Sequence, residues 1–275
     1  MRLSSNKLKS GIWFVLWIFI ILVYLFPFIW IVMTGFRDSI DTYGWPPKFF
    51  FIPKLDAFYQ LFNELNIFWY LKNSIIISSA STILTLLIAS PAAYALSHKK
   101  FKKSRGILFG LLLGRVIPAI ALIIPLFLLF IKLKLYDNFL GLILVYTAMN
   151  IPFTIWILRS FFMDIPESIR EAAVVDGCSE LSAFLRMIIP ISRVGIMTSA
   201  IFIFIACWNE FIFAFTLTGR NINTITLLMK GFKTQYGTLW ADMGASVVIA
   251  TIPIIIFAMI VQKYFVRGLT MGAVK

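Results

Sequence analysis

Long, continuous apolar runs constrain this chain more than any other feature. We predict membrane spans at about 12–36, 73–97, 107–131, 139–158, 195–217 and 246–266. Lipid offers no partner to backbone polar groups, so a run of about 20 apolar residues crosses a bilayer as a helix. The runs lack the short alternating segments of a membrane β-barrel. The sequence therefore predicts an all-α, polytopic membrane protein with six transmembrane helices.

Composition and charge support this class. Hydrophobic residues make up 60% of the chain and charged residues 13%, whereas soluble domains are nearer half apolar and a quarter charged. Segments predicted to lie inside carry fifteen Lys and Arg, those outside carry nine, and Arg115 falls within a span. This bias predicts that both termini are cytoplasmic. The net charge of +13 lies at helix ends, so no nucleic-acid partner is expected.

The titratable residues offer little support for catalysis. Cys178 and Cys207 are far apart, without disulfide or metal spacing, and His98 is the single histidine. Glu210 and Asp242 are too isolated to form a carboxylate pair, so an intramembrane hydrolase is disfavoured. There is no GxxxxGK[ST] pattern, so the chain has no P-loop for ATP. We predict no enzyme activity, metal or cofactor. A structural membrane subunit is the other alternative, and copurification with an ATPase would distinguish it from a transport subunit.

A long polar segment, 164–193, separates the fourth and fifth runs. Its first helix is predicted to begin at Asp164, with Glu167 completing a capping box. Gly177 can adopt the left-handed conformation that ends such a helix. Ser179 is expected to cap a second short helix. The pattern indicates a compact, water-facing pair of helices joined by a turn.

Within this segment the run Glu171-Ala172-Ala173, then Gly177, then Pro190 reproduces the spacing of the EAA loop of ABC importer permeases. Pro190 is predicted to close or kink the second helix. Shorter matches follow in order along the chain: Pro91-Ala92-Ala93-Tyr94-Ala95-Leu96, Ile117-Pro118, Asn150-Ile151-Pro152-Phe153, Asp176-Gly177, Trp208-Asn209 and Gly268-Leu269-Thr270. The chain thus resembles the carbohydrate-type, MalG-like permeases of binding-protein-dependent importers, from about residue 73 to the C-terminus.

The resemblance implies a fold, a location and a set of partners. It implies a type I importer, MetI-like permease core over 73–275, preceded by a first helix and outer loop over 1–72, in a prokaryotic inner or plasma membrane. The implied partners are a second homologous permease subunit, a dimer of ATP-binding subunits and an extracytoplasmic sugar-binding protein. ATP would be bound by those partners. Contact with the ATPase is implied for Glu171, Ala172, Ala173, Asp176, Gly177 and Pro190.

Four polar or aromatic residues are candidates for the substrate path: Trp208, Asn209, Glu210 and Arg115. Charges within spans are costly in lipid, so Arg115 and Glu210 are expected to face the bundle interior. They could form an ion pair, or serve separately, with Arg115 bonding carbonyls near Pro118 and Glu210 bonding Asn209.

The substrate class comes from the resemblance alone. It implies a neutral sugar or oligosaccharide such as maltose, maltodextrin or trehalose. Arg115 is not typical of the family, which leaves an anionic substrate, such as glycerol 3-phosphate or an acidic sugar, as the alternative.

One more element is predicted in the first outer loop. Leu55, Phe58, Tyr59, Phe62 and Leu65 fall near helical spacing and indicate an amphipathic helix at the outer interface. It would serve as a membrane anchor or as a docking surface for the binding protein.

Overall fold

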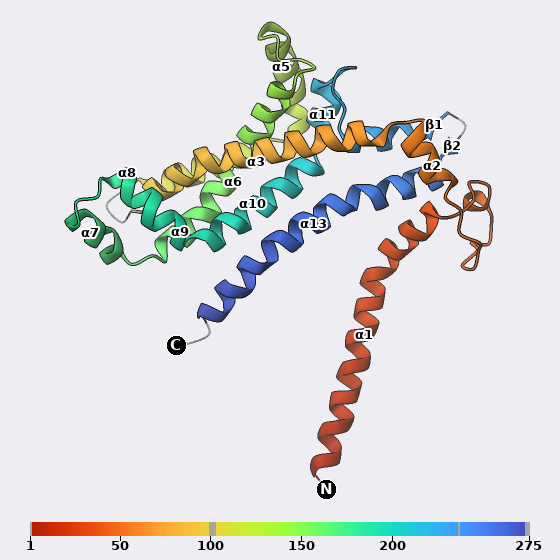
Figure 1. Cartoon of the computed structure of the whole chain (residues 1–275), viewed down its shortest axis with the longest axis horizontal. Helices are drawn as coiled ribbons and strands as arrows, with labels where there is room; N and C mark the ends of the chain where they lie inside the picture. Colours follow the sequence, from red (N-terminus) through yellow and green to blue (C-terminus); the bar gives the residue numbers. More distant parts are fainter. Residues whose placement is uncertain (1, 99–102, 236, 273–275) are drawn as a thin grey trace. The chain divides into compact units, whose positions relative to one another are not determined.

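The structure, a computed structural model, describes residues 2–98, 103–235 and 237–272. Four of the lysines that contribute to the predicted charge bias lie outside the described residues: Lys99, Lys100, Lys102 and Lys275. The predicted all-α class is confirmed (Figure 1). The longer helices are α1 (Arg2–Gly35), α3 (Ile67–Ser97), α5 (Ala119–Lys132), α6 (Phe139–Met163), α10 (Arg193–Trp208) and α13 (Trp240–Gly272).

Shorter elements connect these helices. They are η1 (Asp41–Tyr43), α2 (Asp56–Asn63), α4 (Ser104–Leu113), η2 (Gly114–Val116), α7 (Glu167–Val175), α8 (Glu180–Ala183), η3 (Phe184–Ile188), α9 (Ile189–Ile191), α11 (Ile212–Leu217) and α12 (Ile225–Gly231). The strands β1 (Lys233–Thr234) and β2 (Gly237–Thr238) form a small antiparallel hairpin. The element α2 confirms the helix predicted in the first loop.

Four helical stretches within the described residues are long and apolar enough to cross a membrane: Trp13–Gly35, Ile67–Ser97, Phe139–Met163 and Trp240–Gln262. Two bent pairs bring the total to as many as six spans. Ser104–Val116 and Ala119–Lys132 meet at 88°, and Glu180–Ile191 and Arg193–Trp208 meet at 78°. The structure thus supports four to six spans among the described residues, a range that includes the predicted six.

Two predicted spans are interrupted, which corrects the expectation of continuous helices at 107–131 and 195–217. The first breaks at Ile117 and Pro118, which are both extended, with ψ of 120° and 133°. Proline lacks an N–H and disfavours helix at the residue before it, so the chain turns there. The second breaks after Trp208, where α10 ends and α11 begins four residues later.

One compact unit comprises residues 1–67 and 229–252. Here α1 crosses the start of α13 with the two backbones in direct contact. A Cβ added at Gly35 would lie 2.7 Å from the nitrogen of Ala245, and one at Gly244 would lie 2.6 Å from the nitrogen of Gly35. Small residues permit this approach, as in many membrane helix pairs. The Tyr43 hydroxyl also donates to the Thr238 carbonyl at 2.5 Å.

The other unit comprises residues 68–228 and 253–275. Its core forms where α3, α6 and α10 pack together (Figure 1), and α6 lies close enough to α10 that a Cβ at Gly195 would overlap the ring of Phe161. The Asn150 amide joins the same two helices, donating to the Tyr146 carbonyl at 2.8 Å and to Cys207 Sγ at 3.5 Å. Such satisfied polar groups hold membrane helices in register.

Asp137 organises a loop at the end of α11. Its carboxylate accepts backbone N–H bonds from four consecutive residues, Gly219, Arg220, Asn221 and Ile222, at 2.8–3.2 Å. Burial alone would raise the pKa of Asp137, but these four donors favour the charged form and hold its pKa below the ordinary value. The loop between α5 and α6 therefore fixes the loop that follows α11.

Candidate functional site

The polar segment 164–193 folds as the predicted pair of short helices. The helix α7 ends at Val175, and Gly177, two residues further on, has a φ of +83°. The Gly177 N–H bonds the Val174 carbonyl at 3.0 Å, and the Cys178 N–H bonds the Ala173 carbonyl at 2.9 Å. This pair of bonds is a Schellman motif, and it requires the left-handed residue that the sequence predicted.

The predicted start of α7 is wrong, and that of α8 is confirmed. Asp164 ends α6, and Pro166, without a side-chain bond, precedes α7. Pro166 has an extended conformation (φ −58°, ψ 132°) and occupies the N-cap position itself. The helix therefore begins two residues later than an Asp164 cap would require. Ser179 does cap α8, since its hydroxyl accepts from the Ser182 N–H at 3.2 Å.

Glu167 serves a different purpose from the predicted capping box. Arg170 donates from Nη1 to Glu180 at 2.7 Å and from Nη2 to Glu167 at 3.3 Å. Burial alone would lower the pKa of Arg170, but the two carboxylates outweigh it and the pKa is raised. Because Glu180 lies on α8, Arg170 clamps the two short helices across the turn. This clamp was not predicted from the sequence, although the i,i+3 spacing of Glu167 and Arg170 was a visible signal.

The predicted contact residues divide between two faces of α7. Glu171 and Ala172 are exposed, and Val175 is 86% exposed, whereas Ala173 is only 4% exposed. Glu171, Ala172 and Val175 therefore form a free face, defined here as the outer face of α7. Ala173 packs inward and lets α7 approach the rest of the segment. Asp176 and Pro190 are exposed at the turn and at the end of the second helix.

Pro190 is followed by the end of its helix at Ile191. The preceding residues 184–188 form a π-turn, in which the Ile189 N–H bonds the Phe184 carbonyl. Proline removes one i→i−4 bond, and a wider turn accommodates the loss. Beyond Ser192 the chain bends by 78° into α10. The helix therefore ends one residue after Pro190, in agreement with the prediction that Pro190 closes or kinks the second helix.

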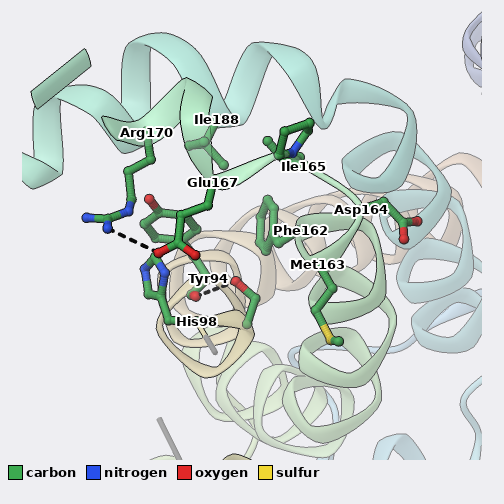
Figure 2. A pocket seen from close by; sticks show the side chains of 11 residues that line it. Tyr94, His98, Phe162, Met163, Asp164, Ile165, Glu167, Arg170 and Ile188 are labelled. Carbon is green, nitrogen blue, oxygen red and sulfur yellow. Dashed lines mark hydrogen bonds and ion pairs between the residues drawn. The ribbon is translucent and has the colours of Figure 1, made fainter. Parts of the chain in front are cut away.

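An aromatic cluster joins this segment to the long helices (Figure 2). The Tyr94 ring, near the end of α3, stacks on Phe184 with centroids 4.9 Å apart and meets Phe162 of α6 edge-on at 5.8 Å. His98 contacts the other side of Tyr94 at 4.6 Å. A cavity of about 190 Å³ lies beside the cluster, between the ends of α3 and α6 and the start of α7. These ring contacts connect η3 to the ends of α3 and α6.

The four substrate-path candidates lie at the two interruptions of the helices. Trp208 is 3% exposed and stacks on Phe204, so its ring belongs to the core. Asn209 is exposed immediately after it. The Glu210 carboxylate accepts from the Phe213 and Ala214 N–H groups at 3.0 and 3.1 Å, and so caps α11.

Arg115 is placed away from any carboxylate partner. It is exposed on η2, and its guanidinium lies 4.8 Å from the centre of the Phe153 ring. None of the four ion pairs among the described residues includes Arg115 or Glu210. The Arg115–Glu210 ion pair is therefore not formed, and the two residues have separate contacts. Arg115 contacts the Phe153 ring and Glu210 caps α11, and neither is shown with the partner expected from the sequence. Capping by Glu210 was missed because it depends on the break after Trp208.

The helical core, the interrupted spans and the clamped polar segment define an integral membrane protein with a polar pair of short helices between its spans. The chain belongs to the family described as the binding-protein-dependent transport system inner membrane component, whose model matches residues 81–271. Within the described residues, no group of three or more His, Cys, Asp or Glu could hold a metal ion.

Two relatives and one solved structure illustrate the family. The chain is 43% identical over 278 residues to the "Probable ABC transporter permease protein y4oR" of Sinorhizobium fredii, across the whole of both chains. It is 35% identical to the trehalose/maltose transport system permease protein MalG of Thermococcus litoralis, over 92% of each chain. Its fold matches a bacterial ABC transporter involved in the import of the acidic polysaccharide alginate, with a TM-score of 0.78, 24% identity and coverage of 95% of this chain and 98% of the other.

Proposed function

We propose that the chain is one of two permease subunits of an ATP-driven importer of sugars or oligosaccharides, with both termini and the 164–193 segment in the cytoplasm. The observation that carries the coupling role is the outer face of α7, where Glu171, Ala172 and Val175 stand free on a helix clamped at its end. The sugar class is supported by the relative that carries trehalose and maltose. The family description supports a binding protein as the donor of substrate.

The proposed mechanism is mechanical coupling. A separate ATPase subunit receives the outer face of α7, and its closure on ATP displaces the segment. Arg170 keeps α7 and α8 together at its bonds of 2.7 and 3.3 Å, so the two helices move as one body. The contact of Tyr94 with Phe184 then carries the displacement into α3. Coupling of this type needs a rigid element with two positions and no chemistry in this chain.

Uptake by the complete importer tests this function. The complex of both permeases, the ATPase pair and the binding protein is reconstituted in vesicles and supplied with labelled trehalose, maltose, maltodextrin and non-sugar solutes. The proposal predicts ATP-dependent accumulation of at least one neutral saccharide. Accumulation of amino acids or metal ions without any saccharide would overturn it.

An anionic substrate is the second candidate, and Arg115 is the observation that favours it. Its exposed guanidinium lies at a break in a predicted span, over the Phe153 ring, and takes part in no ion pair among the described residues. A cation held by an aromatic face retains the capacity to bind an anion. Arg115→Leu should then reduce uptake of an acidic saccharide by about tenfold or more, and Arg220→Leu is a matched control at an exposed position. Equal uptake by both variants would exclude this role.

A further inference from the structure

A second cavity, of about 370 Å³, lies between the end of α1 and the start of α13, within the first compact unit. Its walls include the apolar side chains of Ile31, Met243 and Val247, together with the rings of Trp30 and Trp240. It flanks the close crossing of the two helices. The substrate path and the 164–193 segment share no lining residue with it, so the proposed function leaves this cavity unexplained.

One buried cation, Arg37, closes the cavity. Arg37 is only 5% exposed. One of its terminal nitrogens donates to the Lys48 carbonyl at 2.6 Å, and its guanidinium lies 4.4 Å from the Trp30 ring centre and 5.1 Å from that of Phe51. Its Nε is buried without a hydrogen-bond partner. Arg37 therefore keeps a strong donor that the protein itself leaves unused.

The acidic residues near Arg37 in sequence are already paired with lysines. Asp38 binds Lys54, and Asp41 binds Lys48 at 2.6 Å. No ion pair among the described residues includes Arg37. A buried charge that lacks a counter-ion is costly, and an anion supplied from outside would remove this cost.

The position along the helices identifies the environment of the cavity. The first apolar span ends at Gly35, two residues before Arg37, and the last one begins at Trp240. Both ends meet at the same cavity, so it lies at the boundary between hydrocarbon and water. Tryptophan is typical of that level, and an arginine guanidinium binds phosphate through charge-assisted hydrogen bonds.

We propose that this cavity binds one anionic phospholipid. Its phosphate pairs with the guanidinium of Arg37, which lines the cavity, and one acyl chain fills the space lined by Ile31, Met243 and Val247. A largely apolar cavity beside one buried cation at the interface fits this amphipathic ligand, because a sugar would leave most of its hydroxyls unpaired against these walls.

Native mass spectrometry of the purified complex tests the site. Delipidated complex is mixed with dioleoylphosphatidylglycerol or dioleoylphosphatidylcholine at matched concentrations, and lipid retained on this subunit is compared among variants. We expect Arg37→Gln to lower phosphatidylglycerol affinity by about tenfold or more, because a charge-assisted bond is lost. Arg37→Lys should retain part of it. The matched control Arg220→Gln, at an exposed arginine outside the cavity, should bind as the wild type does.

Two further measurements decide the remaining outcomes. If Arg37→Gln fails to assemble, Val247→Phe fills the cavity with Arg37 intact. Loss of the tightly held phosphatidylglycerol then supports the proposal, and retention overturns it. A photoreactive residue at Met243 identifies the occupant in native membranes: a phospholipid adduct supports the proposal, whereas an adduct to the partner permease or to no molecule contradicts it. Equal retention of the two lipids by the wild type also contradicts it.

Discussion

Replacing Gly177 gives the sharpest perturbation of the 164–193 segment, because its cost is confined to the backbone. Gly177 has a φ of +83°, and no heavy atom of the described residues lies within 4 Å of where a Cβ would stand. Alanine would thus meet no neighbour but would be held in the left-handed region, at a cost of about 1–2 kcal/mol. Gly106, in α4, also has open space around its Cβ and has no positive φ. Gly106→Ala is therefore the matched control, and should stabilise its helix by up to about 1 kcal/mol.

The expected effect is a weaker association with the ATPase subunit. A cost of 1–2 kcal/mol on the conformation that docks corresponds to a loss of about 5–30-fold in affinity. The assay measures binding of purified ATPase to the permease pair in nanodiscs, together with sugar-stimulated ATP hydrolysis. Asparagine tolerates the left-handed region better than alanine, so Gly177→Asn should lie between alanine and the wild type.

A size series separates backbone strain from contact with the ATPase. Within this chain the Cβ of either residue meets no neighbour within 4 Å, so Gly177→Leu and Gly177→Ala should carry the same backbone cost in the isolated permease. A larger loss for leucine in the complex would show that the partner approaches Gly177 closely. If Gly177→Ala and Gly106→Ala bind the ATPase equally well and couple normally, the reasoning that the turn positions the outer face of α7 is refuted.

Three other variants test the remaining contacts. Arg170→Gln and Glu180→Gln should each weaken coupling, and a double-mutant cycle should give an interaction of about 0.5–1 kcal/mol, since the Glu180 end of the pair is exposed; additive effects would exclude the clamp. Asp137→Asn should lower stability by about 1 kcal/mol. Because the folded pKa of Asp137 is depressed, its contribution to the free energy of unfolding is complete above its unfolded pKa and disappears as pH falls through the folded pKa. Unfolding measured from pH 7 to pH 3 should therefore show the stabilities of the variant and the wild type converging. A difference that stays constant with pH would contradict this. Tyr94→Phe should preserve coupling, because the hydroxyl is buried without a partner and the ring contact with Phe184 is retained. Tyr94→Ala should reduce sugar-stimulated hydrolysis, and its cost in stability should stay below the about 3–5 kcal/mol of a fully buried ring, because Tyr94 is half-buried. Normal coupling by the alanine variant would remove Tyr94 from the mechanism.

Local signals in the sequence were sufficient for the turn of the polar segment. The left-handed φ of Gly177 and the cap at Ser179 depend on a few neighbouring residues, and both are confirmed. The start of α7 was wrong because two candidates compete there, and the extended Pro166 outweighed the side chain of Asp164. Local capping rules do not decide between such competitors.

Features that depend on chain direction could not be read from apolar runs. Hydropathy reports that residues 107–131 are apolar but not that the chain turns by 88° at Pro118. Glu210 became a helix cap only because α10 stops at Trp208. The clamp from Arg170 to Glu180 joins residues ten apart, and requires the angle between two helices that periodicity does not supply.

The central claim is that the outer face of α7 docks a separate ATP-binding subunit, and cysteine crosslinking tests it most directly. Cys178 is replaced by serine, because it is partly exposed, and a single cysteine is introduced at Ala172 or Ala173. Ala172 is exposed and Ala173 is 4% exposed. We expect Ala172→Cys to crosslink to the ATPase subunit in the assembled complex, with a yield that changes on ATP binding, and Ala173→Cys not to crosslink. Equal crosslinking at both positions, or none at Ala172 in an assembled and active complex, would contradict the account.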